Sequence, residues 1–229
     1  EEFPVDSARY WSARSAVGDD LPLKKNDLRS GEKLMRKIWN ASKLVESLAP
    51  EKPDIEEEEL EEIDRWMLGE VDELVEFTTE KFENYEFAKA RDEIRNVFWH
   101  TFCDDYLEIA KQRLDEEDSE SARYVLREAH SAFLKLFAPI LSHITEEIWN
   151  DMYQDSSIHL SEWPEAYGVQ ADLEAGETAM QVISALRTYK NENGMALNEE
   201  LEEVQIFGDV TGFEDAIREA MHLQELEQH

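Results

Sequence analysis

Residues 98–114, FWHTFCDDYLEIAKQRL, decide the fold because they combine many aromatic side chains with helical spacing. One apolar face, spaced mostly by threes and fours, belongs to a helix that begins near Glu86 and comprises Phe87, Ile94, Phe98, Phe102, Tyr106 and Ile109. A second apolar stripe lies about a quarter turn away and comprises Trp99, Cys103, Leu107 and Ala110. A helix that is apolar on two adjoining faces must be surrounded by other helices, which predicts that it lies at the centre of a bundle.

Three carboxylates, Asp104, Asp105 and Glu108, interrupt this apolar run. Asp104 and Glu108 are four residues apart and would repel each other on a bare helix, so we expect a positive side chain or a backbone donor to face them. The alternative is a carboxylate pair for hydrolysis. Adjacent and i, i+4 carboxylates are frequent throughout so acidic a chain, and we therefore predict no catalytic residue here.

Periodicity and capping residues predict further helices on both sides of this segment. Their expected ranges are 7–17, from 26 or 30 to 48, 55–82, 119–137, 139–153 and 172–193. Residues 201–210, LEEVQIFGDV, alternate like a strand, and a short helix follows from about Gly212. The predicted fold class is therefore mostly α, a helical bundle over the first 165 residues followed by a small α/β extension.

The composition is strongly acidic, with 23 basic against 55 acidic side chains and a net charge of −32. Nucleic-acid-binding proteins usually carry a basic patch and a high isoelectric point, so the charge by itself argues against that function. The charge also fits a protein from a cell with molar internal salt, where the Debye length falls to about 3 Å and carboxylate repulsion is screened. We favour this second interpretation because the acidic residues are interleaved with apolar ones along the chain.

The single cysteine, Cys103, has no partner for an intramolecular disulfide and is interpreted as a small buried hydrophobic residue. This favours a reducing, cytoplasmic location. No run of about 18 apolar residues and no signal peptide is present, so no membrane association is expected. The sequence begins at Glu1 in the middle of a pattern, and we expect it to be part of a longer protein.

One stretch departs from the acidic composition. Residues 24–43 contain seven basic and only two acidic side chains, and three- and four-residue spacing places Lys33, Arg36, Lys37 and Asn40 on one helix face. Such a face suits an unpaired RNA loop, whose bases stack and form hydrogen bonds on their exposed edges. The alternative is that these cations only offset carboxylates of neighbouring helices, and the residues alone do not decide between the two.

Other sites for chemistry are weakly indicated. None of the six histidines has a second histidine or cysteine at zinc-site spacing. His143 with Glu146 and Glu147 could hold a metal from one helix, but a half-buried histidine beside solvated glutamates is the favoured interpretation. There is no glycine-rich phosphate loop and no Ser-His-Asp pattern. We therefore assign no catalytic residue and no metal ligand.

Several segments resemble, in order, the valyl-tRNA synthetases, which are class I aminoacyl-tRNA synthetases, and most closely the archaeal type. The segments are DSARYWSARSAVGDDLPLKKNDL, KIWNASKLV, DRWMLGEVDELVE, FCDDYLEIAKQRL, LFAPILSHITEEIWNDMY, SIHLSEWPEA and ISALRTYKNENGMALNEELEEVQIFGD. Related isoleucyl and leucyl enzymes share the Asp-Arg-Trp and Glu-Glu-Ile-Trp signals. The run from Phe102 to Glu108 favours the valine enzyme.

The resemblance implies an anticodon-binding domain that holds the anticodon arm of valine tRNA and reads its middle A and third C. The family's role maps here to Lys33, Arg36, Lys37 and Asn40, with Trp39 either stacking or packing. Arg91 and Arg95 on the central helix are further candidates for contacts with the RNA backbone. Family members often carry Asn-Phe just before this motif, whereas this chain has Leu34 and Met35 nearby, which are not aromatic.

The family's His-Ile-Gly-His and Lys-Met-Ser-Lys-Ser signatures and its editing domain are absent from this sequence. ATP binding with magnesium and aminoacyl transfer would therefore belong to a catalytic domain elsewhere in the parent chain, and this segment itself would need no cofactor. The expected division is a stem-contact segment in residues 1–28, the anticodon-binding bundle in 29–165 and the start of an α/β extension in 166–229. We expect a monomer. The alternative function is an acidic helical module that binds a protein partner through an apolar groove.

Overall fold

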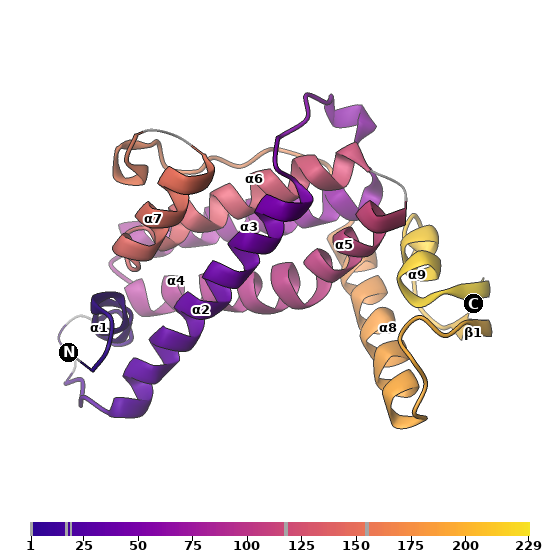
Figure 1. The fold of residues 1–229 in the computed structure, drawn as a ribbon, viewed down its shortest axis with the longest axis horizontal. Coiled ribbons are helices and arrows are strands. Elements are labelled where there is room, and N and C mark those ends of the chain that lie inside the picture. Colours follow the sequence, from indigo (N-terminus) through magenta and orange to yellow (C-terminus); the bar gives the residue numbers. More distant parts are fainter. Residues whose placement is uncertain (1, 17, 19, 117–118, 154–155) are drawn as a thin grey trace.

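The computed structural model describes residues 2–16, 18, 20–116, 119–153 and 156–229. Its main body consists of helices that pack lengthwise, and a small α/β unit lies at one end (Figure 1). The helices of the body are α1 (Val5–Ser12), α2 (Lys25–Leu48), α3 (Glu62–Glu83), α4 (Phe87–Asn96), the π-helical η2 (Val97–Tyr106), α5 (Leu107–Glu116), α6 (Glu120–Phe137) and α7 (Ser142–Met152). The predicted class, a mostly α bundle with a small α/β extension, is confirmed.

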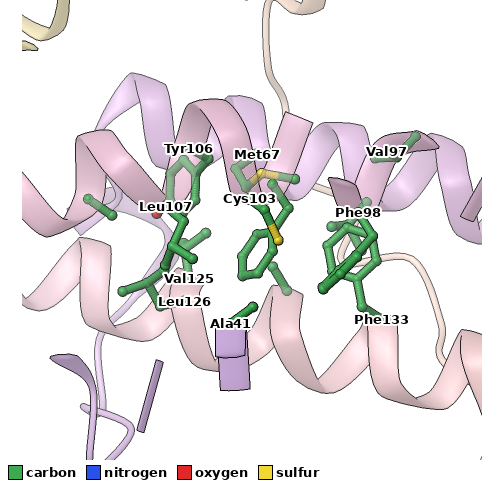
Figure 2. Close-up of a cluster of buried hydrophobic side chains, with 14 of the residues drawn as sticks. Ala41, Met67, Val97, Phe98, Cys103, Tyr106, Leu107, Val125, Leu126 and Phe133 are labelled. Carbon is green, nitrogen blue, oxygen red and sulfur yellow. The ribbon is translucent and has the colours of Figure 1, made fainter. Parts of the chain in front are cut away.

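The predicted central helix exists and consists of α4, η2 and α5 in direct succession, with helical backbone angles at both junctions. Its apolar faces are buried against α3 and α6 (Figure 2). The ring of Phe133 on α6 lies 5.3 Å from that of Phe98 and 5.1 Å from that of Phe102. These contacts are of the offset and edge-on kind that aromatic rings prefer.

The middle of this helix is π-helical, which the sequence did not predict. Hydrogen bonds from i to i+5 widen each turn, so side chains spaced by four stay closer to one face than in an α-helix. Phe98, Phe102 and Tyr106 have this spacing, and their rings stack in succession with centroids 5.9 and 6.3 Å apart. Cys103 is buried beside them, as predicted, and burial raises the pKa of its thiol to about 12.

A buried carboxylate joins four helical elements. Asp64 on α3 is fully buried and accepts hydrogen bonds from the Tyr106 hydroxyl at 2.5 Å and the Ser121 hydroxyl at 2.5 Å. Two guanidinium nitrogens of Arg113 donate to its two oxygens, each at 2.9 Å. Because every partner comes from a different element, this network fixes α3 relative to η2, α5 and α6.

The helices beside the central one follow the expected boundaries with small changes. α2 ends just before Pro50, and Ser119 caps α6 by accepting from the Ala122 amide at 3.2 Å. The helix expected from residue 55 instead begins at Glu62, because a separate 3₁₀ turn, η1 (Glu57–Glu59), precedes it. Leu60 then takes extended backbone angles, which place its side chain in the core.

The first helix differs from the prediction. α1 ends at Ser12 rather than near residue 17, and neither Asp6 nor Ser7 caps it, since both lie inside the helix and are buried. The Asp6 carboxylate instead accepts from the backbone amides of His143 and Ile144, at 3.1 and 2.8 Å. It therefore satisfies the free amides at the start of α7, a capping role taken by a residue distant in sequence.

The α/β unit begins with α8 (Leu173–Glu192), which Asp172 caps as predicted. β1 (Leu201–Ile206), α9 (Glu214–Met221) and β2 (Leu223–Gln228) follow, and the two strands pair in parallel with Leu201 opposite Leu223. The sequence indicated β1 and α9 but not β2. Of the described residues, no helix is long and apolar enough to cross a membrane.

A lysine anchors this unit. Lys190 on α8 is buried and donates to three backbone carbonyls, those of Leu197 at 2.9 Å, Glu199 at 2.6 Å and Met221 at 2.8 Å. Burial lowers the pKa of its ammonium. Two of the acceptors lie in the segment before β1, and the third is the last residue of α9. The Lys190 side chain therefore fixes both of these segments to α8.

Candidate nucleic-acid interface

The predicted cationic face occurs on α2 and is open to solvent. Lys33, Arg36 and Asn40 are exposed and Lys37 is half-buried. In the part of the chain that the structure describes, Lys33 and Asn40 have no hydrogen-bond or ion-pair partner. Leu34 and Met35 are buried beneath this face, and Met35 also lines a neighbouring groove. The face therefore presents free donors and an amide, as a site for a polar ligand requires.

Two of the cations are already engaged. Arg36 forms an exposed ion pair with Glu32 one turn earlier, at 3.2 Å. Lys37 forms an ion pair with Asp104 on η2 at 2.8 Å and lies 5.4 Å from the centre of the Trp99 ring. The expectation that a positive group would meet Asp104 is confirmed, and Lys37 consequently has one fixed position next to an aromatic ring.

Trp39 was expected either to stack on RNA or to pack in the core, and the structure leaves its side chain at the surface. Its exposed fraction is 38%. Trp39 follows the buried Ile38, and its indole lines a groove between α1, α2 and α7. The Lys43 ammonium lies 5.2 Å from the centre of the indole ring. An exposed indole of this kind can stack on an unpaired base.

The two arginine candidates on α4 have different environments. Arg91 is buried, pairs with Asp92 and donates to the Tyr10 carbonyl at 3.2 Å. Arg95 is half-buried and lies over Trp99, with its guanidinium carbon 5.3 Å from the ring centre. Arg95 is thus on the same surface as Lys37, whereas Arg91 lies deeper and is held by protein groups.

Sequence reasoning missed Trp99 as a candidate because the apolar pattern assigned it to the second core stripe. In the structure it is half-buried and sits between two cations, Lys37 and Arg95. The signal in the sequence was the arginine four residues before it, since i, i+4 side chains are neighbours on a helix. Trp99 connects the cationic face of α2 to α4.

The remaining acidic and histidine clusters are structural. Arg187 on α8 donates to the Asp104 carbonyl at 3.3 Å, and its guanidinium lies 3.9 Å from Asp105, whose pKa is raised by burial. His143 pairs with Asp6 at 2.8 Å, while Glu146 accepts from the Ser157 hydroxyl and the Ile158 amide. The described residues include no group of histidine, cysteine and carboxylate side chains arranged to hold a metal.

Comparison with known proteins identifies the part of the fold that follows α2. Residues 64–206 match the family model described as the anticodon-binding domain of tRNA ligase. The chain belongs to this family. The match begins at Asp64, the centre of the buried network, and extends through the central helix to the end of β1.

Two relatives of this chain are both named valine–tRNA ligase. The chain is 57% identical to a valine–tRNA ligase of Haloarcula marismortui over 99% of its own length, and 35% identical to one of Thermococcus kodakarensis over 90%. It spans about a quarter of the length of these curated relatives. The Haloarcula relative fits the prediction of a protein adapted to high salt.

A solved structure supports the fold of the anticodon-binding domain. A ternary complex of LeuRS from Agrobacterium radiobacter K84 with tRNA and LeuAMS matches with a TM-score of 0.57 over 74% of this chain and 21% of that one. The identity is 18%, so this likeness concerns the arrangement of the helices. Bundles of this shape therefore recur across tRNA ligases of different names.

Proposed function

We propose that this chain binds the anticodon arm of valine tRNA, and that its parent protein is a valine–tRNA ligase. In that parent, a catalytic domain outside residues 1–229 would use ATP with magnesium to attach valine to the tRNA. The domain itself would take no cofactor and would serve to select and position the tRNA. The names of the curated relatives support this assignment.

The observation that carries the proposal is the pair of free polar side chains on α2. Lys33 and Asn40 have no partner among the described residues, although acidic side chains outnumber basic ones by more than two to one in the sequence. Both side chains can therefore donate hydrogen bonds to an external anion or base edge without first breaking a contact within the protein. Lys37, Arg36 and Trp39 flank the pair on the same helix.

The salt adaptation determines which contacts can provide affinity. Binding that depends on phosphate neutralisation falls linearly on a log–log plot against salt concentration, so counterion release contributes little at molar salt. Recognition would then depend on stacking and on hydrogen bonds to base edges. Trp39 and Asn40 are suited to these two tasks, and Arg91 would act indirectly because protein groups already hold its guanidinium.

The test is a filter-binding titration in about 2 M potassium chloride, with valine tRNA and a copy altered in its anticodon. We expect the altered copy to bind more weakly, because base-edge contacts carry the discrimination. Equal binding of both, or no binding of either, would contradict the proposal.

The second candidate, a protein-binding module, is favoured by one observation. A largely apolar groove of about 600 Å³ lies between α1, α2 and α7 and includes Val5, Met35, Trp39 and Ile144 among its walls. Val5 is 63% exposed, which is high for an aliphatic side chain on a helix. The same titration decides between the candidates, since a module that binds only proteins would not distinguish the two tRNAs.

Three further assignments belong to the proposal. Residues 1–28 would contact the tRNA stem and the catalytic domain of the same chain, residues 29–165 would form the anticodon-binding bundle, and residues 166–229 would begin the α/β extension. The protein would be a cytoplasmic monomer. Sedimentation of the chain with and without tRNA tests the monomer, with one chain per tRNA as the expected stoichiometry.

A further inference from the structure

A pocket of about 260 Å³ lies where α1, α2 and α4 meet, next to the cationic face but separate from it. These three elements gather at the end of the molecule opposite α8 and α9 (Figure 1). Three arginines from two segments line the pocket: Arg14, which follows α1, and Arg91 and Arg95 on α4. Convergence of three guanidinium groups on one small cavity is unusual in a chain with a net charge of −32.

Two carboxylates in the wall orient two of these arginines. Asp27 pairs with Arg14 at 2.5 Å, and Asp92 pairs with Arg91, whose guanidinium also donates to the Tyr10 carbonyl. Arg95 has no carboxylate partner among the described residues and rests on the ring of Trp99. The pocket therefore holds one guanidinium in excess over its carboxylates, with five N–H donors of fixed geometry.

Two neutral donors complete the lining. The indole nitrogen of Trp11 is buried and has no hydrogen-bond partner in the described structure. Ser30 on α2 adds a hydroxyl that likewise has no partner among the described residues. An unpaired buried donor costs free energy, so an acceptor that entered the pocket and met the Trp11 indole nitrogen would remove that cost.

We propose that this pocket binds one phosphodiester group of the tRNA backbone, with Arg95 and Arg14 as its ionic contacts and Trp11 and Ser30 as its neutral donors. Arg91 is a positioning residue that fixes Tyr10 and Asp92. A phosphate accepts several hydrogen bonds at once, and planar guanidinium groups match its oxygens bidentately.

The pocket adjoins the proposed base-reading face. Arg95 lines the pocket and lies over Trp99, and the same ring lies beside Lys37 of α2. A strand that meets Lys33, one turn of α2 from the pocket residue Ser30, can thus place a backbone phosphate in the pocket. This inference rests on the proposed function, and it adds a contact that fixes the position of the RNA without reading its sequence.

The test compares tRNA binding by the chain and by four variants, Arg95→Gln, Arg14→Gln, Trp11→Phe and the control Arg29→Gln. Arg29 is an exposed arginine of α2 outside the pocket, so its substitution removes the same charge from the same surface. At the lowest salt concentration at which the chain stays folded, we expect roughly tenfold weaker binding for the two pocket arginine variants, as for loss of a charged hydrogen bond, and less than about threefold for the control. Trp11→Phe keeps an aromatic ring and removes the indole N–H donor together with part of the ring system.

Ethylation of single tRNA phosphates tests whether the pocket binds a phosphodiester group. Ethylation at one position should weaken binding to the unmodified chain and have no further effect on Arg95→Gln, because the two changes remove the same contact. The Trp11 indole N–H resonance, assigned with Trp11→Phe, should shift when tRNA is added and stay unshifted in Arg95→Gln. The pocket assignment is wrong if Arg95→Gln binds tRNA as tightly as Arg29→Gln does. It is also wrong if ethylation weakens tRNA binding by Arg95→Gln as much as it weakens binding by the unmodified chain.

The two proposals fail differently. Phosphate contacts carry no sequence information, so the pocket variants should still prefer valine tRNA over the copy altered in its anticodon. Loss of that preference in the unmodified chain overturns the proposed function. If the preference for valine tRNA is preserved and Arg95→Gln leaves the tRNA affinity unchanged, only the pocket assignment is overturned. Saturation of the Trp11 resonance by inorganic phosphate, with no response to tRNA, would also overturn the assignment to RNA.

Discussion

Two groups of charged residues in this domain differ in almost every respect. The buried group centres on Asp64, which accepts four hydrogen bonds from Tyr106, Arg113 and Ser121. The exposed group on α2 includes Lys33 and Asn40, which have no partner among the described residues. The first group uses all of its hydrogen-bonding capacity within the protein, and the second leaves its capacity free.

This difference separates the residues that identify the family from those that are candidates for its function. The segments with the strongest resemblance, DRWMLGEVDELVE and FCDDYLEIAKQRL, contribute Asp64, Tyr106 and Arg113 to the buried network. Burying an ion pair is costly unless both partners are completely satisfied, which restricts the residue types that fit. The motif that reveals the fold is therefore built into the core, and the candidate binding residues lie on a neighbouring helix.

The largest expected effect is on the buried group. Asp64→Asn preserves the shape of the side chain but leaves the Arg113 guanidinium without its buried counter-charge. Removing one partner of a buried ion pair typically costs about 3–5 kcal/mol of the free energy of unfolding. Urea denaturation of the variant and the unmodified chain measures this difference.

The matched control is an exposed pair on the same molecule. Arg218 and Asp215 on α9 lie 2.8 Å apart at the surface, and Arg218→Gln should change the free energy of unfolding by less than about 1 kcal/mol. A cost for Asp64→Asn no larger than for this control would remove the distinction between the two groups.

A second buried polar network predicts a dependence on pH. His130 on α6 lies between the Ser42 hydroxyl, 2.8 Å from Nε2, and the Tyr153 hydroxyl, 2.7 Å from Nδ1. Each hydroxyl also has a backbone carbonyl to donate to, Ile38 at 2.8 Å for Ser42 and Arg127 at 3.2 Å for Tyr153, so the neutral ring has a partner at both nitrogens. Burial, with the nearby Arg127 charge, lowers the pKa of His130 to about 3.

The direction of this pH dependence follows from the unfolded state, where the pKa of a histidine is about 6.5. Between about pH 6.5 and 3 the unfolded chain binds a proton at His130 that the folded chain does not, so the stability falls as the pH falls, by up to about 1.4 kcal/mol per pH unit. The His130 ring resonances in the folded protein should stay constant down to about pH 5. Titration near pH 6.5 in the folded protein would contradict the buried neutral form.

The helical architecture was largely predictable from the sequence, since apolar periodicity and capping residues are local signals. Ser119 and Asp172 cap α6 and α8 as predicted, and the apolar faces of the central helix are in the core. The errors occurred where a distant residue determines the outcome. Asp6 resembled the cap of its own helix but caps α7, which is 137 residues away in sequence.

The candidate site was less predictable for a related reason. Spacing identified the cationic face, but it could not show that Lys37 is held by Asp104 or that Trp99 leaves the core to meet Lys37 and Arg95. Arg91 and Arg95 looked equivalent in sequence, yet one is buried among protein acceptors and the other is available. Their burial and their hydrogen-bond partners distinguish them, and both depend on which helices pack next to α4.

An intermediate effect is expected on the exposed group. At molar salt, Trp39→Ala should weaken tRNA binding by roughly 1–3 kcal/mol through loss of stacking, and Asn40→Ala by about 1 kcal/mol through loss of a base-edge hydrogen bond. Asn40→Ala should lower the free energy of unfolding by no more than about 0.5 kcal/mol, because exposed substitutions rarely do, whereas Trp39→Ala also loses the packing of the buried part of its ring. Filter binding and urea denaturation of the same preparations measure both quantities, and unchanged binding in both variants would contradict the assignment.

The smallest effect is expected for Lys43, although it lies on the same helix and contacts the same indole. Its ammonium already pairs with Glu46 at 2.9 Å and Asp151 at 2.8 Å, and these two carboxylates raise its pKa. Any contact it made with a phosphate would be screened at molar salt. Lys43→Ala should therefore change tRNA affinity by less than about 0.5 kcal/mol. If it weakened binding more than Asn40→Ala, charge rather than base contacts would dominate recognition, and the cationic face of α2 would act as a simple electrostatic surface.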